Sequence, residues 1–164
     1  MPVSPLFFVL LQRKTIKTHN TKETTQKIDK YEQQALDFCK KHNVQIHIVK
    51  SGTVQGFPNC KHDRHMTHIR NRVKITTALG SFGFYFYGSY ADWQYGRKAT
   101  PYQILADISC YIYTPDNFKD FCAEYGYDDD SMSAFRVFKG SRKMSENLHK
   151  YFTEEQLTDL AEIQ

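Results

Sequence analysis

Residues 60–68 bring together the side-chain types that bind transition metals, namely Cys60, His62, His65 and His68. Zinc is held by three or four nitrogen and sulfur ligands in a tetrahedral arrangement. The spacing matches no established zinc finger, and His68 falls in a predicted strand whose direction differs from that of the preceding loop. We therefore interpret the segment as a solvated basic loop, and we predict no metal and no other cofactor.

A second pattern lies just beyond this loop, where cations alternate with apolar residues. Arg70, Arg72 and Lys74 share one face, because successive side chains of a strand point to opposite faces. Tyr85 and Tyr87 occupy the same face of the strand that returns beside it. Cations next to tyrosines provide phosphate contacts and stacking surfaces, so this face is a candidate for binding nucleic acid. The competing interpretation is that cation–π pairs across the strands simply cover the sheet.

The acidic run of Asp128, Asp129 and Asp130 is a third candidate for binding a partner. It lacks the ligand spacing and the closing glutamate of a calcium-binding EF-hand. It is typical of the start of a helix, where the helix dipole favours acids. The sequence contains no glycine-rich phosphate loop, nucleophile elbow or H-E-x-x-H motif, so we predict a protein that is not an enzyme.

The charges divide unequally along the chain. Residues 1–98 hold 16 Lys and Arg against six Asp and Glu, whereas residues 99–164 hold six against 12. The net charge of +4 therefore combines a basic first part with an acidic second part. A basic surface favours phosphate or an acidic protein as its partner, and an acidic surface favours a basic one. The alternative is that the two parts face each other or the solvent.

Length and composition predict a folded protein of the cytoplasm. Of its 164 residues, 40% are hydrophobic and 15% aromatic, which is enough to enclose a core. The four cysteines are far apart, and most lie among apolar neighbours, as buried free thiols do. The apolar run 6–11 is too short to span a bilayer, and basic residues follow it rather than precede it, unlike in a signal peptide. We expect no membrane partner.

The periodicity of apolar residues predicts the elements that position these features. In the first part of the chain we expect a helix at 24–42 that begins with an Asn20–Glu23 capping pair, a loop at 52–59, and strands at 44–48, 66–79 and 82–87. Gly80 and Ser81 would form a two-residue turn between the last two strands. In that register Ile75 pairs with Phe86.

Capping residues punctuate the second part of the chain. Threonine before proline marks the starts of two helices, at Thr100 and Thr114. Gly126 ends the second of them, a longer helix follows at about 131–150, and a capping box at Thr153 opens a short last helix. The predicted class is α+β, with an N-terminal helix, a small antiparallel sheet with a hairpin, and a helical C-terminal half. We expect residues 21–164 to form a single domain after a flexible or extended segment at 1–20.

From about Val73 onward, the chain resembles a set of small uncharacterised proteins encoded by phages, prophages and plasmids. The strings that carry the resemblance are FYFYGSYAD at 84–92, TPYQILA at 100–106, FKDFCAEYGYD at 118–128 and LHKYFTEEQL at 148–157. The resemblance as a whole covers roughly half of the chain, and no functional residue is carried over from the group.

This resemblance implies a mobile-element setting, in which small accessory proteins often act against host defences, as anti-CRISPR proteins do. The expectation is a non-enzymatic protein that inhibits a host defence nuclease complex, a protein or ribonucleoprotein, through a charged surface. Its acidic helices would imitate phosphate, or its basic hairpin would bind an acidic surface or guide RNA. The alternative is an accessory protein that binds nucleic acid with residues 61–74 and the tyrosine face, with an affinity that falls steeply with salt.

Overall fold

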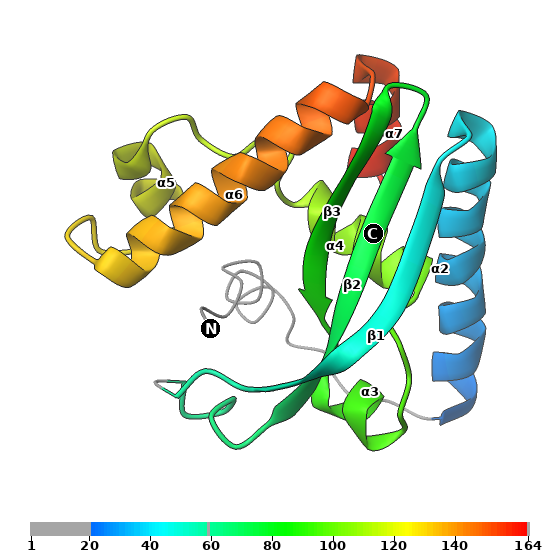
Figure 1. Cartoon of the computed structure of the whole chain (residues 1–164), viewed down its shortest axis with the longest axis horizontal. Helices are drawn as coiled ribbons and strands as arrows, with labels where there is room; N and C mark the ends of the chain where they lie inside the picture. Colours follow the sequence, from blue (N-terminus) through cyan, green and yellow to red (C-terminus); the bar gives the residue numbers. More distant parts are fainter. Residues whose placement is uncertain (1–20, 59, 164) are drawn as a thin grey trace.

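The computed structural model describes residues 21–58 and 60–163, and within the first helix it describes side chains from residue 30 onward. In this part of the chain a long helix precedes a three-stranded antiparallel sheet, and further helices follow it (Figure 1). This is the α+β arrangement that the sequence predicts. The predictions for the segment 1–20 and for the Asn20–Glu23 capping pair lie outside the described positions and side chains.

The sheet is formed by three strands in the order β1-β2-β3. The first helix and the strands are α2 (Thr21–His42), β1 (Gln45–Gln55), β2 (Thr67–Thr77) and β3 (Gly80–Tyr87). The helices that follow are α3 (Tyr90–Gln94), α4 (Pro101–Ser109), α5 (Phe118–Tyr125), α6 (Met132–Tyr151) and α7 (Glu154–Ala161). β1 continues through Gly52, where we had expected a loop, because a bulge between Lys50 and Thr53 absorbs the irregularity.

The core lies between one face of the sheet and the helices α2, α4 and α7, which lie beside and behind the sheet in Figure 1. Alternate strand residues form one side of the core, and the predicted apolar stripes of the helices form the other. Its buried residues include Ile48, Val73, Ile75, Phe82, Phe86, Ile104, Leu105, Ile108, Leu157 and Leu160. Burial of these side chains is the main force that holds the helices on the sheet. We call the opposite face of the sheet the outer face.

The hairpin between β2 and β3 turns two residues earlier than predicted. Ile75 is opposite Phe82 rather than Phe86, and the turn is made by Ala78 and Leu79. The predicted register was therefore wrong by four residues. Because four is an even number, each strand side chain still points to the face expected for it.

The side chain of Thr77 stabilises the early turn. Its hydroxyl donates a hydrogen bond to the backbone carbonyl of Tyr151 at 2.5 Å and accepts one from the N–H of Leu79 at 3.2 Å. A hydroxyl that bonds nearby backbone groups in this way stabilises a turn. β2 therefore ends where its last residue meets the end of α6.

Capping chemistry confirms three of the predicted helix boundaries. Thr100 and Thr153 are N-caps with capping boxes, and Pro101 is the first residue of α4. Gly126 ends α5 in the left-handed conformation that favours glycine. These signals are local, so they could be recognised in the sequence.

The predicted helix start at Thr114 was wrong. Its hydroxyl donates to the carbonyl of Tyr111 at 2.8 Å and so extends the turn that follows α4. The N-cap of α5 is Asn117, whose side chain accepts a hydrogen bond from the N–H of Asp120 at 2.9 Å. Asparagine caps a helix at least as well as threonine, so residue preference did not decide between the two positions.

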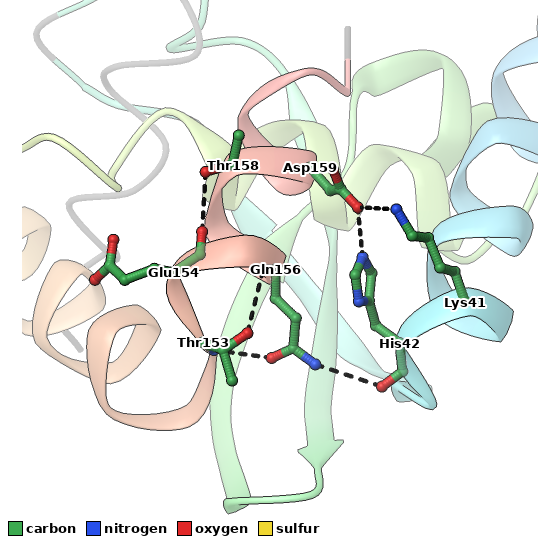
Figure 2. Close-up of polar contacts among 7 residues, drawn as sticks. All are labelled: Lys41, His42, Thr153, Glu154, Gln156, Thr158 and Asp159. Carbon is green, nitrogen blue, oxygen red and sulfur yellow. Dashed lines mark hydrogen bonds and ion pairs between the residues drawn. The ribbon is translucent and has the colours of Figure 1, made fainter.

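A polar cluster joins the C-terminal end of α2 to α7 (Figure 2). Asp159 Oδ2 accepts a hydrogen bond from Lys41 Nζ at 2.7 Å and lies 2.7 Å from His42 Nε2. Gln156 Nε2 adds a long hydrogen bond, at 3.5 Å, to the carbonyl of His42. The bond from Lys41, and then that from His42, holds the pKa of Asp159 below its usual value, and the same bond raises the pKa of Lys41. The cluster fixes the two helices against each other.

Candidate nucleic-acid interface

The five residues predicted to share one face of the hairpin do share it. Arg70 is opposite Tyr87, Arg72 is opposite Tyr85, and Lys74 is two residues farther along β2. They lie on the outer face, because the alternate positions of both strands point into the core. The sheet therefore gathers this part of the predicted site on one surface.

Arg70 is held by contacts within the sheet. Its Nη2 donates to the carbonyl of Ser51 at 2.9 Å, and its Nε donates to the Ser51 hydroxyl at 3.2 Å. Its guanidinium carbon lies 5.1 Å from the centre of the Tyr85 ring, which is a cation–π arrangement. For this pair the competing interpretation holds. Arg72 and Lys74 are exposed, and none of the ion pairs found among the described residues involves either of them.

The two tyrosines of β3 differ in their access to a partner. Tyr85 is 44% exposed, whereas Tyr87 is only 8% exposed. Tyr87 is therefore a buried part of the sheet and not a stacking surface, which corrects the prediction for this residue. At this end of the sheet the loop between β1 and β2 lies over the outer face, because Asp63 of that loop bonds His68.

The loop between β1 and β2 is built around the buried pair of Asp63 and His68. His68 Nδ1 lies 2.6 Å from the carbonyl oxygen of Gly88, and Nε2 lies 2.6 Å from Asp63 Oδ1. A carbonyl only accepts, so Nδ1 is the donor in the bond to Gly88. Asp63 Oδ2 accepts from the N–H of Phe57 at 2.7 Å. The carboxylate thus fixes the loop to His68 near the start of β2, and His68 in turn bonds Gly88, which follows β3.

Close backbone packing completes this loop. The N–H of Gly56 donates to the carbonyl of Met66 at 2.8 Å, and the N–H of Met66 donates to that of Asp63 at 2.8 Å. A Cβ at Gly56 would overlap the backbone oxygen and the carboxylate of Asp63, so a larger residue fits only if the loop moves. The loop is a folded platform that exposes Lys61 and Arg64.

The same arrangement separates the metal-ligand side chains of residues 60–68. His68 is turned into the buried pair, whereas His62 and His65 are exposed. Arg64 Nε donates to His65 Nε2 at 3.0 Å. Among the described residues, no group of three His, Cys, Asp or Glu side chains is placed to hold a metal ion. The interpretation of this segment as a basic loop fits these positions, although its buried carboxylate was not foreseen.

The exposed charge of this region has one sign. From residue 38 to residue 106 the sequence holds ten Lys and Arg but only two acids, Asp63 and Asp92. Both acids are buried, one beside His68 and the other bonded to Ser89 in the cap of α3. Within the three described strands, no Asp or Glu occurs. The exposed cations of the strands, the loop and the α3 segment are Lys50, Lys61, Arg64, Arg72, Lys74, Arg97 and Lys98.

Helix α3 and the aromatic residues around it were not predicted. The Ser89 hydroxyl accepts from the N–H of Asp92 at 3.2 Å, and Asp92 Oδ2 accepts from the N–H of Ser89 at 3.0 Å. This capping box has the S-x-x-D pattern, which is the signal that could have located the helix. The segment exposes Tyr90, Trp93 and Tyr95.

Asp128, Asp129 and Asp130 do not join the outer face. They are exposed in the turn between α5 and α6, at the end of α6 that is far from the sheet (Figure 1). They precede Ser131, the N-cap of α6, and the first turn of that helix contains no acid. α6 has 20 residues and is therefore about 30 Å long. The acidic turn and the outer face are separate surfaces.

In the described part of the chain, no helix is both long enough and apolar enough to cross a membrane. Comparison with known protein families, with curated proteins and with solved structures gave no match. Function is therefore inferred from the residues and their geometry.

Proposed function

We propose that this protein binds nucleic acid by contacting its phosphates with the outer face of the sheet and the loop attached to it. The observation that carries the proposal is the one-sided charge of this surface. Its exposed charges are cations, and the two acids of residues 38–106 are buried. Binding to a phosphate backbone is largely electrostatic, so a surface of this kind is suited to it.

The positions of the cations support the proposal. Arg72 and Lys74 are two residues apart on β2, so about 6.8 Å of strand separates them and each can contact a different phosphate. Arg70 is already fixed by Ser51 and lies beside Tyr85. Groups that are held in place before binding lose less conformational freedom when the ligand arrives.

The loop between β1 and β2 extends this surface. Asp63 anchors the loop over the outer face through His68, and the loop exposes Lys61 and Arg64. Because the anchoring carboxylate is buried, its negative charge does not face the solvent beside these cations. A strand of nucleic acid that lies along the sheet would therefore meet cations from two elements.

Fluorescence anisotropy with a labelled oligonucleotide tests the proposal. At physiological salt the double variant Arg72→Glu with Lys74→Glu should bind about 100-fold more weakly, because neither side chain can then bind a phosphate. The matched control is Arg136→Glu with Lys143→Glu, which makes the same charge change on the exposed side of α6. It should weaken binding by less than about threefold, because salt screens distant charges. Equal losses in the two variants, or no binding by the wild-type protein, would contradict the proposal.

A second candidate function is inhibition of a host defence nuclease complex, in line with the resemblance to proteins of mobile elements. The observation in its favour is that the exposed acids at 128–130 lie apart from the outer face, so the molecule offers two surfaces of opposite charge. On this proposal the acidic turn imitates phosphate, or the basic face binds an acidic surface or guide RNA, in the cytoplasm of the host.

Affinity capture of the tagged protein from a host lysate, with and without nuclease, separates the two candidates. A stoichiometric protein partner that survives nuclease supports inhibition. Recovery of nucleic acid alone, lost on nuclease treatment or at raised salt, supports binding through the outer face. Inhibition through a charged surface would be contradicted if a variant changed at both Asp128–Asp130 and Arg72–Lys74 inhibited as well as the wild type.

A further inference from the structure

The segment around α3 exposes three aromatic side chains. Tyr90 is 41% exposed, Trp93 is 39% exposed and Tyr95 is 69% exposed. The ring centres of Tyr90 and Trp93 are 5.3 Å apart. Leaving grouped aromatic surface in water is unfavourable, so such a group indicates a binding surface. We call these three residues the α3 aromatic surface.

The α3 aromatic surface is held in place by its neighbours. The capping box fixes the start of the short helix, and Lys50 Nζ donates to the carbonyl of Gly96 at 2.9 Å, which ties the end of the segment to β1. The guanidinium carbon of Arg97 lies 5.1 Å from the centre of the Tyr95 ring. Aromatic rings that are fixed in this way lose little conformational entropy when a ligand stacks on them.

This surface lies at one end of the sheet and is attached to its core-facing side, because Lys50, which bonds Gly96, is opposite Asn71, and Asn71 bonds Ala99. α3 packs against β2, and in Figure 1 it lies at the end of the sheet from which the loop between β1 and β2 extends. Lys50, Arg97 and Lys98 are exposed in or beside the segment. Aromatic rings set among cations are typical of surfaces that bind unpaired bases, with the bases on the rings and the phosphates on the cations.

We propose that the ligand is single-stranded nucleic acid, whose bases stack on the α3 aromatic surface while its phosphates contact the neighbouring cations. This inference rests on the proposed function, to which it adds base contacts. In a duplex the bases are already stacked on one another, so their flat faces are not available to the rings. A single strand exposes those faces and can therefore stack on the rings as a duplex cannot.

Trp93 gives a direct readout, because it is the only tryptophan in the chain. Its fluorescence is measured while the full-length protein is titrated with a single-stranded oligonucleotide, with the corresponding duplex, and with inorganic polyphosphate, which carries charge without bases. Stacking predicts saturable quenching by the single strand alone, and binding of the single strand about 10-fold tighter than that of the duplex. Equal quenching by polyphosphate, or tighter binding of the duplex, would overturn the proposal.

The variant Tyr95→Ala distinguishes failure of this inference from failure of the proposed function. Because Tyr95 is the most exposed of the three rings, the variant should fold, as circular dichroism can verify. It should bind the single strand about 10-fold more weakly and polyphosphate as well as the wild type does. Tyr113→Ala removes another strongly exposed tyrosine, outside α3, and should change neither affinity.

Two results would overturn the inference in different ways. If Tyr95→Ala binds the single strand like the wild type while Arg72→Glu with Lys74→Glu loses binding, base stacking is excluded and phosphate binding stands. If the wild-type protein binds neither the oligonucleotides nor polyphosphate, both proposals fail.

Discussion

The basic sheet and the acidic end around α5 use their acids in opposite ways. In the sheet, its loop and the α3 segment, Asp63 and Asp92 are buried, and the exposed charges are positive. In residues 116–130, six acids are exposed beside a single exposed cation, Lys119. Among the described residues, these two regions are therefore separate surfaces of opposite charge.

This comparison shows that burial decides what an acid contributes. A buried carboxylate with several hydrogen bonds holds backbone segments together, and removing it leaves its partners without a bond. An exposed carboxylate adds little to stability, but its charge is available to a binding partner. Removing a carboxylate should therefore lower the free energy of unfolding when the acid belongs to the basic sheet region. The same change at the acidic end around α5 should leave it almost unaffected.

Removal of the Asp63 carboxylate should have the largest effect. Asp63→Ala takes the carboxylate partner away from the buried His68 and an acceptor away from Phe57. The free energy of unfolding, measured by urea denaturation, should fall by about 3–5 kcal/mol. The control Asp129→Ala, at the exposed end, should stay within about 0.5 kcal/mol of the wild type. Similar losses in the two variants would show that burial does not distinguish the two regions.

A matched pair of glycines separates stability from binding. Gly96 and Gly126 have φ angles of 64° and 73°. A Cβ added to either glycine would meet no atom of the described residues within 4 Å, apart from the adjacent residues of the chain. Alanine at either position should lower the free energy of unfolding by about 1 kcal/mol, through backbone strain alone. Because Gly96 follows Tyr95, only Gly96→Ala should also weaken binding of an oligonucleotide. Weaker binding by Gly126→Ala would break the comparison.

Charge reversal at the acidic end should have little effect on nucleic-acid binding. The double variant Asp128→Lys with Asp129→Lys changes the net charge by as much as Arg72→Glu with Lys74→Glu does, with the opposite sign. At physiological salt it should raise the affinity for an oligonucleotide by less than about threefold, because charges more than about 8 Å apart are largely screened. Anisotropy titration measures this change, and a rise of an order of magnitude would place the binding surface near α5.

The smallest effect is expected at Asp159, an acid of the helical half that is bonded to both Lys41 and His42. Its pKa lies below the usual 3.8, because Lys41 and then His42 bond its ionised form. Its contribution to stability is therefore complete above about pH 4 and is lost as the pH falls through the lowered pKa of the folded state. When the pH is lowered from about 5 to about 3, the free energy of unfolding should therefore fall less in Asp159→Asn than in the wild type. Urea denaturation at both pH values measures the difference, and an unchanged pH dependence would contradict this role.

Much of the fold could be predicted because its signals are local. The caps at Thr100 and Thr153 and the stop at Gly126 depend on residues within one turn of a helix. The order of the elements other than α3 followed from periodicity. The register of the hairpin was not predicted: the turn is stabilised by the bond of Thr77 to Tyr151, and such a distant contact leaves no local pattern.

The candidate site was predictable to a similar extent. Alternation placed Arg72, Lys74 and Tyr85 on one face, because the two-residue period of a strand is fixed by its backbone. It could not show that Tyr87 is buried or that the carboxylate of Asp63 is enclosed. Both depend on how the loop between β1 and β2 folds over the end of the sheet.

The salt dependence of binding tests the central claim most directly. The affinity of the wild-type protein and of Arg72→Glu with Lys74→Glu for one labelled single strand is measured over a series of salt concentrations. If the outer face contacts phosphates, the logarithm of the affinity falls linearly with the logarithm of the salt concentration. The slope of the double variant should be shallower by about 1.4, or about 0.7 for each phosphate that the variant no longer binds. A wild-type affinity that is independent of salt, or equal slopes for the two proteins, would contradict the account.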